Sequence, residues 1–216
     1  MIWHLIIILI LYVAVFLTGE FFYRRGMRTE YSRKIAHIGG GFVSLLLPVW
    51  FGVPMAVVIG IFFALFLLII KRQKLLDSVH KINGHSSGAV LFPLGLTVTF
   101  VTFVPIKAII FQGAVLILAL ADGLAGVIGY KFGQKKYNLT GEKTWLGSVL
   151  FFIVTLLVLL GVVWFVKGQL SALDFVFAII AALLVSFLEG LFGKGLDNLV
   201  VPVSAGAAIY YLLYIV

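Results

Sequence analysis

A single acidic residue, Asp122, lies inside an otherwise apolar stretch and is followed by a loop rich in glycine and lysine. A carboxylate within a membrane-spanning helix is costly, and it points by default to a bound cation or substrate. The alternative is an ion pair that joins two helices. The lysines of the loop are Lys131, Lys135, Lys136 and Lys143. A carboxylate beside this loop predicts a site for a metal-bound polyphosphate.

The end of this loop has the chemistry of a phosphate site. Lys143 supplies a point charge, Thr144 and Ser148 supply hydroxyls, and the start of the next helix supplies backbone amides that bind anions. The alternative is a basic flank that fixes the position of this helix. Gly126 and Gly129 share a helical face with the buried carboxylate, and they either let a neighbouring helix approach or leave room for phosphate.

Other polar residues are expected at the same ends of neighbouring helices. His37 follows Arg33 by one helical turn, and it either contacts phosphate, relays a proton or is merely hydrogen-bonded at the interface. Glu189 and Asp197 flank a glycine-rich turn, and both are candidate metal ligands. Asp197 and its neighbour Asn198 could instead only cap the last helix.

The composition is that of a membrane protein. Hydrophobic residues make up 63% of the 216 residues and charged residues only 11%. Such a chain cannot bury its apolar surface in one soluble core, so we expect an integral membrane protein. The absence of cysteine excludes disulfides, thiolate metal sites and cysteine nucleophiles.

About eight apolar runs approach the length of about 17–25 residues that a transmembrane helix needs. They are 2–22, 34–51, 54–71, 87–104, 106–129, 145–166, 172–191 and 199–215. The sequence shows no repeat and no long linker, so residues 1–216 are predicted to form one all-α polytopic transmembrane bundle. Segment 73–83 has the spacing of a short amphipathic helix that lies in the interface.

The net charge of +8 is explained by topology rather than by nucleic-acid binding. Basic residues concentrate in the alternate loops 23–33, 71–86, 130–144 and 192–198. By the positive-inside rule these loops are cytoplasmic and both termini are non-cytoplasmic. The polar site then opens to the cytoplasm, and we expect a prokaryotic plasma membrane. No nucleic-acid partner is expected, and a homo-oligomer is left open.

Short motifs follow one another between about residue 33 and residue 202. They are Arg33-Lys34-x-x-His37, Gly88 with Phe92-Pro93-Leu94-Gly95, Asp122-Gly123-x-Ala125-x-x-x-Gly129-x-x-x-Gly133, Lys143-Thr144-x-x-Gly147-Ser148, Glu189, and Gly195-Leu196-Asp197-Asn198-Leu199-x-x-Pro202. In this order they resemble the polyprenol kinase family of CTP-dependent membrane lipid kinases. That family includes dolichol kinase, phytol kinase and the CTP-dependent diacylglycerol kinase of yeasts.

The resemblance implies transfer of the γ-phosphate of CTP to a lipid alcohol with Mg²⁺, the alcohol being an isoprenoid (polyprenol, phytol or geranylgeraniol) or diacylglycerol. The expected catalytic residues are Asp122, His37 and Lys143, and the expected metal ligands are Asp122, Glu189 and Asp197. The expected nucleotide-binding residues are Arg33, Lys34, Gly126, Gly129, Lys131, Lys143, Thr144, Gly147, Ser148 and Asn198. One departure is Leu146, where family members often carry glutamate.

Two other functions remain as alternatives. The central segment is also similar to CDP-diacylglycerol synthases, which are cytidylyltransferases, but their acidic, histidine- and glycine-rich C-terminal signature is absent here. A small-solute transporter could also use an acid within the membrane and helices lined by glycine. Its polar residues are expected near the midplane and on both sides, whereas here they cluster on one side.

Overall fold

The computed structural model describes residues 2–73, 87–137 and 143–216. The elements are α1 (Ile2–Arg24), α2 (Thr29–Ser44), α3 (Leu47–Trp50), α4 (Val53–Arg72), α6 (Gly88–Phe103), α7 (Ala108–Leu116), the π-helix η1 (Ile117–Asp122), α8 (Gly123–Phe132), β1 (Lys136–Tyr137), β2 (Lys143–Thr144), α9 (Trp145–Lys167), α10 (Ala172–Leu191) and α11 (Asp197–Tyr214). The predicted all-α class is confirmed, with one short hairpin added. Apart from Gln73, the predicted interfacial helix 73–83 lies outside the described residues.

Each predicted span overlaps described helix, the second span (34–51) being divided into α2 and α3, and α7, η1 and α8 together form the fifth. In the second span α2 begins at Thr29 rather than at residue 34, and it ends at Ser44. Hydropathy misses this start because the first turns of α2 are polar. Pro48 and Pro54 lie in the first turns of α3 and α4, where a missing N–H costs no helical hydrogen bond.

By length and composition, α1, α4, α9, α10 and the continuous helix Ala108–Phe132 can cross a membrane. Large apolar side chains are exposed on these helices, with Trp3 at 76%, Phe165 at 72% and Phe187 at 61%. Such exposure is unfavourable in water, whereas a bilayer presents an apolar surface to it. The protein is therefore an integral, multi-pass membrane protein.

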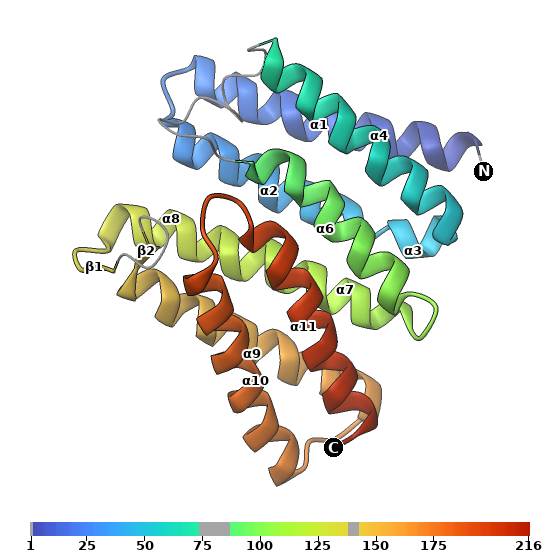
Figure 1. The fold of residues 1–216 in the computed structure, drawn as a ribbon, viewed down its shortest axis with the longest axis vertical. Coiled ribbons are helices and arrows are strands. Elements are labelled where there is room, and N and C mark those ends of the chain that lie inside the picture. The colour runs from blue at the N-terminus through green and yellow to red at the C-terminus, as the bar shows by residue number, and fades with distance from the viewer. Residues whose placement is uncertain (1, 74–86, 138–142) are drawn as a thin grey trace.

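The helix made of α7, η1 and α8 lies at the centre of the bundle. In its most apolar 18-residue stretch 67% is buried, whereas the corresponding share is 22–39% in the other candidate spans. On one side of it α1 packs on α2 and α4 packs on α6, and on the other side lie α9, α10 and α11 (Figure 1). The charged ends of α2, η1, α10 and α11 thereby meet around one space.

Candidate active site

A cavity of about 1030 Å³ lies between these helices. Its polar half is lined by residues from α2, η1, α8, the short hairpin and the facing ends of α9, α10 and α11. Its other half is lined mainly by apolar residues of α1, α2, α4 and α6. Pockets for small-molecule ligands measure about 300–1,000 Å³. The cavity therefore has room for more than one reactant.

Asp122 ends the π-helix η1, and only 6% of its surface is exposed. Its Oδ2 accepts a hydrogen bond of 2.6 Å from Lys34 Nζ and lies 3.1 Å from His37 Nε2. Lys34 Nζ also donates to the Asp122 carbonyl at 2.9 Å, and His37 Nε2 lies 2.9 Å from the Leu118 carbonyl. Short π-helical turns are frequent at functional sites. Here two carbonyls of the wide turn bind side chains of α2.

The hydrogen-bond partners of His37 indicate which of its ring nitrogens carries a proton. Nε2 lies beside the Leu118 carbonyl and the Asp122 carboxylate, and a carbonyl oxygen can only accept a hydrogen bond. Nε2 therefore carries a proton. In the neutral imidazole, Nδ1 is then the nitrogen that can accept one.

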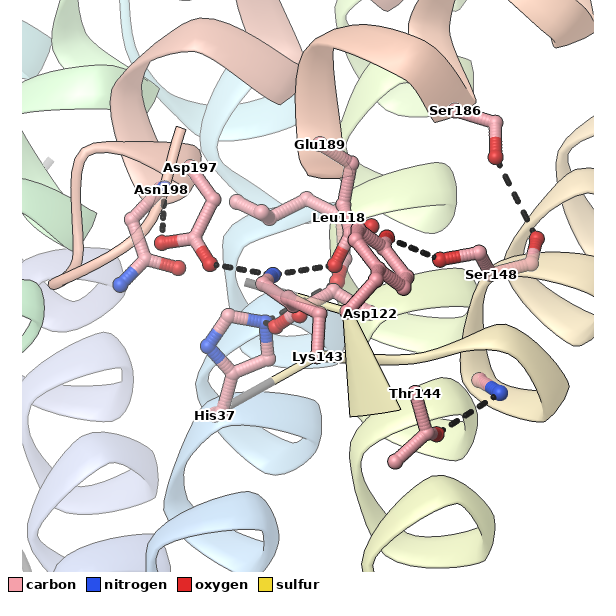
Figure 2. A network of polar contacts seen from close by, with 12 residues as sticks. His37, Leu118, Asp122, Lys143, Thr144, Ser148, Ser186, Glu189, Asp197 and Asn198 are labelled. Carbon is pink, nitrogen blue, oxygen red and sulfur yellow. Dashed lines mark hydrogen bonds and ion pairs between the residues drawn. The ribbon is translucent and has the colours of Figure 1, made fainter. Parts of the chain in front are cut away.

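Lys143 lies between two carboxylates (Figure 2). Its Nζ donates to Glu189 Oε1 and, at 3.0 Å, to Asp197 Oδ2. The hairpin positions it, because β2 pairs with β1 and Lys143 stands opposite Tyr137. Burial alone would lower the pKa of Lys143, but the charges of Asp197 and Glu189 raise it well above its usual range. Lys143 therefore stays cationic.

Three carboxylates converge at this centre. Asp122, Glu189 and Asp197 each offer an oxygen within 4.8 Å of the other two. Glu189 is 3% exposed, and its Oε2 has no hydrogen-bond partner among the described residues. Sets of oxygen ligands suit Mg²⁺ and Ca²⁺. The residues therefore fit a divalent cation, and the unpartnered oxygen of Glu189 is available to it.

The start of α9 closes another side of the polar half. Thr144 caps the helix, and its hydroxyl accepts a hydrogen bond of 3.1 Å from the Gly147 amide. A Cβ at Gly129 would lie 3.2 Å from the Cα of Gly147, so α8 and α9 approach closely there. Ser148 also lines the cavity, and its hydroxyl is hydrogen-bonded to that of Tyr137.

The turn between α10 and α11 is tied to the start of α6. Gly195 has φ +95°, and a side chain there would collide with the backbone of Gly88. Asn198 Nδ2 donates to the Gly88 carbonyl at 2.9 Å, while its Oδ1 has no partner in the described part of the chain. The N-cap residue of α11, Leu196, makes no side-chain capping bond, whereas Asp197 Oδ1 accepts a hydrogen bond of 3.1 Å from the Asn198 amide in the first turn of this helix.

Most residues expected at the site do line the cavity. They are Arg33, Lys34, His37, Asp122, Gly126, Gly129, Lys143, Thr144, Gly147, Ser148, Glu189, Asp197 and Asn198. Lys131 is not among the described lining residues, and its Nζ lies 4.9 Å from the ring centroid of Phe132. Taken individually, Lys136 would be interpreted as a solvated charge that sets the membrane topology, but it does line the cavity. Only the hairpin distinguishes it from the neighbouring lysines, and the sequence carries no clear signal for that hairpin.

Leu146, the departure from the family pattern, is 42% exposed and is absent from the described lining of the cavity. Leucine at this position therefore removes no ligand from the three-carboxylate centre. Lys34 lines the cavity, and its ammonium is bound to Asp122, a pairing that the motifs do not specify. It neutralises that carboxylate within the cavity.

Comparison with known proteins supports the resemblance. No family model matches the chain, and no solved structure matches it significantly. Among curated proteins, the phytol kinase of Synechocystis sp. is 29% identical over 197 residues, which cover 89% of this chain and 84% of the relative. Similarity over this length confirms the resemblance that the short motifs indicated.

Proposed function

We propose that the protein is a CTP-dependent kinase that transfers the γ-phosphate of CTP to an isoprenoid alcohol held in the membrane. The observation that carries the proposal is the single cavity that joins a carboxylate and lysine centre to an apolar half. An enzyme that phosphorylates a lipid needs a polar site for the nucleotide next to an apolar site for the lipid tail. The name of the relative, phytol kinase, supports both the reaction class and the class of acceptor.

The polar half is suited to a nucleoside triphosphate. Asp122, Glu189 and Asp197 would hold Mg²⁺, which when bound neutralises the charge of the triphosphate. Lys143 and the backbone amides at the start of α9 would bind phosphate oxygens of the nucleotide. Phosphoryl transfer depends mainly on such positioning and charge neutralisation.

The acceptor hydroxyl would lie beside His37, where the two halves of the cavity meet. His37 Nδ1 accepts the hydroxyl proton while the alcohol oxygen forms its bond to the γ-phosphorus. The bond from that phosphorus to the bridging oxygen breaks, and CDP leaves. Asp122 fixes the orientation of the imidazole through Nε2, at 3.1 Å.

The test is phosphate transfer by the purified protein in detergent. We would supply γ-labelled CTP, ATP, GTP or UTP with geranylgeraniol, phytol, a long polyprenol or diacylglycerol, and use Asp122→Asn as the blank. Magnesium-dependent label in an isoprenoid alcohol, greatest from CTP, is the expected result. A CDP-lipid and pyrophosphate formed from CTP and phosphatidic acid would instead establish a cytidylyltransferase. Absence of any lipid product would contradict the proposal.

A further inference from the structure

One acid that lines the cavity lies apart from the other three. Of the four carboxylates in the described lining, Asp122, Glu189 and Asp197 converge at one centre. The fourth, Glu30, lies in the first turn of α2, on a wall whose other charged residues include Arg33 and Lys34. An acid beside a site for a polyanion weakens the binding of that anion. Glu30 therefore needs an explanation other than phosphate binding.

The contacts between α2 and α8 show where Glu30 lies relative to the three-carboxylate centre. Lys34 is bound to Asp122, just before α8 begins. Tyr31, one turn nearer the start of α2, contacts Tyr130 near the end of α8. The two helices therefore run antiparallel, and the start of α2 lies beside the end of α8 at one end of the bundle (Figure 1). At 1.5 Å per residue, Tyr130 is about 12 Å along the helix from Asp122.

Tyr130 presents an aromatic ring at this end of the cavity. The ring lies 5.6 Å from that of Tyr31 at an angle of 87°, and its hydroxyl accepts a hydrogen bond of 3.3 Å from Arg28 Nη1. Although α2 holds the ring in this way, Tyr130 is 44% exposed and lines the cavity. Aromatic rings bind nucleobases by stacking, and they accept any base because every base has a π-face.

The cavity offers two regions for the base of a nucleotide whose phosphates are bound near Lys143. One is the apolar half, which is lined mainly by apolar residues and where the polar edge of a base would lose its hydrogen bonds with water. The other is the end of the polar half, where both Tyr130 and Glu30 line the wall. The second region supplies an aromatic face and a polar partner, so we expect the base there.

Glu30 can distinguish between bases by the direction of a hydrogen bond. An ionised carboxylate accepts hydrogen bonds and donates none. Cytosine presents an amino group at the position where uracil presents a keto oxygen. The carboxylate of Glu30 would therefore bind the edge of cytosine and repel that of uracil.

We propose that Tyr130 and Glu30 form the subsite for the nucleobase. The ring of Tyr130 stacks on the base, and the Glu30 carboxylate accepts a hydrogen bond from the amino group of cytosine. The inference rests on the proposed function for the class of nucleotide, but both residues lie outside the positions that the sequence motifs specify. Tyr130 supplies affinity for the base, and Glu30 supplies the selectivity.

The selectivity is tested by equilibrium binding of CTP and UTP with Mg²⁺ to the purified protein in detergent, without a lipid acceptor. The wild type should bind CTP at least about 10-fold more tightly than UTP. Glu30→Gln should bind both about equally, because the glutamine amide can accept from an amino group or donate to a keto oxygen. Glu20→Gln is the control, because Glu20 is paired with Arg24 and is absent from the described cavity lining. An unchanged ratio in Glu30→Gln would overturn the role of Glu30.

The stacking is tested with inorganic triphosphate as a probe that has no base. Tyr130→Leu should weaken CTP binding about 5–150-fold but change triphosphate binding less than about 2-fold, whereas Tyr130→Phe should keep both. The control is Tyr211→Leu, since Tyr211 is 43% exposed, lies 5.7 Å from the ring of Phe177 and is absent from the described lining. An equal loss of CTP and triphosphate binding in Tyr130→Leu would overturn the stacking.

The base subsite and the kinase can fail separately, because binding is measured without an acceptor. The expected binding ratios without phosphate transfer to any alcohol would leave the subsite standing and reject the kinase. Phosphate transfer in which Glu30→Gln keeps the wild-type preference for CTP over UTP would reject the subsite alone.

Discussion

Two aspartates, Asp122 and Asp174, are buried to a similar degree, with 6% and 2% of their surface exposed. Each is bonded to a lysine, at 2.6 Å to Lys34 and at 2.8 Å to Lys167. The partners of Asp174 are local, because Lys167 and the capping residue Ser171 are at most seven positions away. Lys34 is 88 positions away from Asp122. One pair stabilises a helix start, and the other joins two distant helices.

The surroundings of the two aspartates also differ in whether every carboxylate oxygen has a hydrogen-bond partner. Asp174 Oδ1 binds Lys167, and its Oδ2 accepts from both the amide and the hydroxyl of Ser171. The centre around Asp122 contains two further carboxylates, and Glu189 Oε2 has no partner among the described residues. Buried polar atoms are normally paired, so an unpaired carboxylate oxygen needs an explanation, of which a bound ion is one. Similar burial and a similar lysine partner thus serve a helix cap in one place and a candidate site in the other.

The largest contrast is expected from removing each negative charge. Asp122→Asn should lower kcat/KM at least about 10³-fold, because it removes a proposed metal ligand and the partner of His37. Asp174→Asn should leave kcat/KM within about 2-fold and lower the stability by about 1–2 kcal/mol, because it weakens the capping box. Transfer assays and thermal unfolding in detergent measure both effects. Near-wild-type activity of Asp122→Asn would remove the distinction between the two aspartates.

The sequence predicts much of this contrast. The positive-inside rule predicts Asp122 on one side of the membrane and Asp174 on the other. The capping box of Ser171 and Asp174 was not among the predictions above, although its two members are only three positions apart in the sequence. The all-α class and the positions of the spans follow from hydropathy, because each span must be long enough to cross the bilayer.

Long-range pairings could not be predicted in the same way. The loop lysines are the nearest candidates to Asp122 in the sequence, yet its close partner is Lys34 from α2. That choice depends on how α2 packs against η1, which hydropathy does not specify. The π-helix and the hairpin that positions Lys143 also depend on tertiary packing. The residues that line the apolar half of the cavity could not be predicted either, because in sequence they resemble any other helix contact.

Removal of Lys143 should lower the stability of the protein more than removal of Lys167, the partner of Asp174. Lys143→Met leaves Glu189 and Asp197 without their cation, and we expect a loss of about 2–3 kcal/mol, reduced because Lys143 is 21% exposed. Millimolar Mg²⁺ should restore most of the melting temperature by binding the carboxylates that have lost their lysine partner. Lys167→Met should cost about 1 kcal/mol with no response to Mg²⁺.

The pH dependence follows from the raised pKa of Lys143. A raised pKa means that the stabilisation by this lysine is fully present below the unfolded value of about 10.4 and is lost only as the pH rises through the higher folded value. The stability difference between Lys143→Met and the wild type should therefore be constant from pH 6 to 9.

The same magnesium response in Lys143→Met and Lys167→Met would contradict the proposed metal site.

A smaller effect is expected from Glu189→Gln. The change keeps the shape of the side chain but weakens one proposed metal ligand, so the Mg²⁺ concentration for half-maximal transfer should rise about 10–100-fold. Glu20→Gln is the control, because Glu20 is also buried, is paired with Arg24 and is absent from the described cavity lining. Its magnesium dependence should match that of the wild type. An unchanged magnesium requirement in Glu189→Gln would exclude Glu189 as a ligand.

The smallest difference should separate two helix caps, Thr144 and Ser171. Each hydroxyl accepts a hydrogen bond of 3.1 Å from a backbone amide at the third position of its helix. Thr144→Ala and Ser171→Ala should therefore each cost about 1 kcal/mol of stability. Only Thr144 lines the cavity, so only Thr144→Ala should also raise the KM for CTP, by about 3–10-fold at 0.7–1.4 kcal/mol for one hydrogen bond. If both variants lose stability and neither changes this KM, Thr144 is a cap alone and the nucleotide does not reach the start of α9.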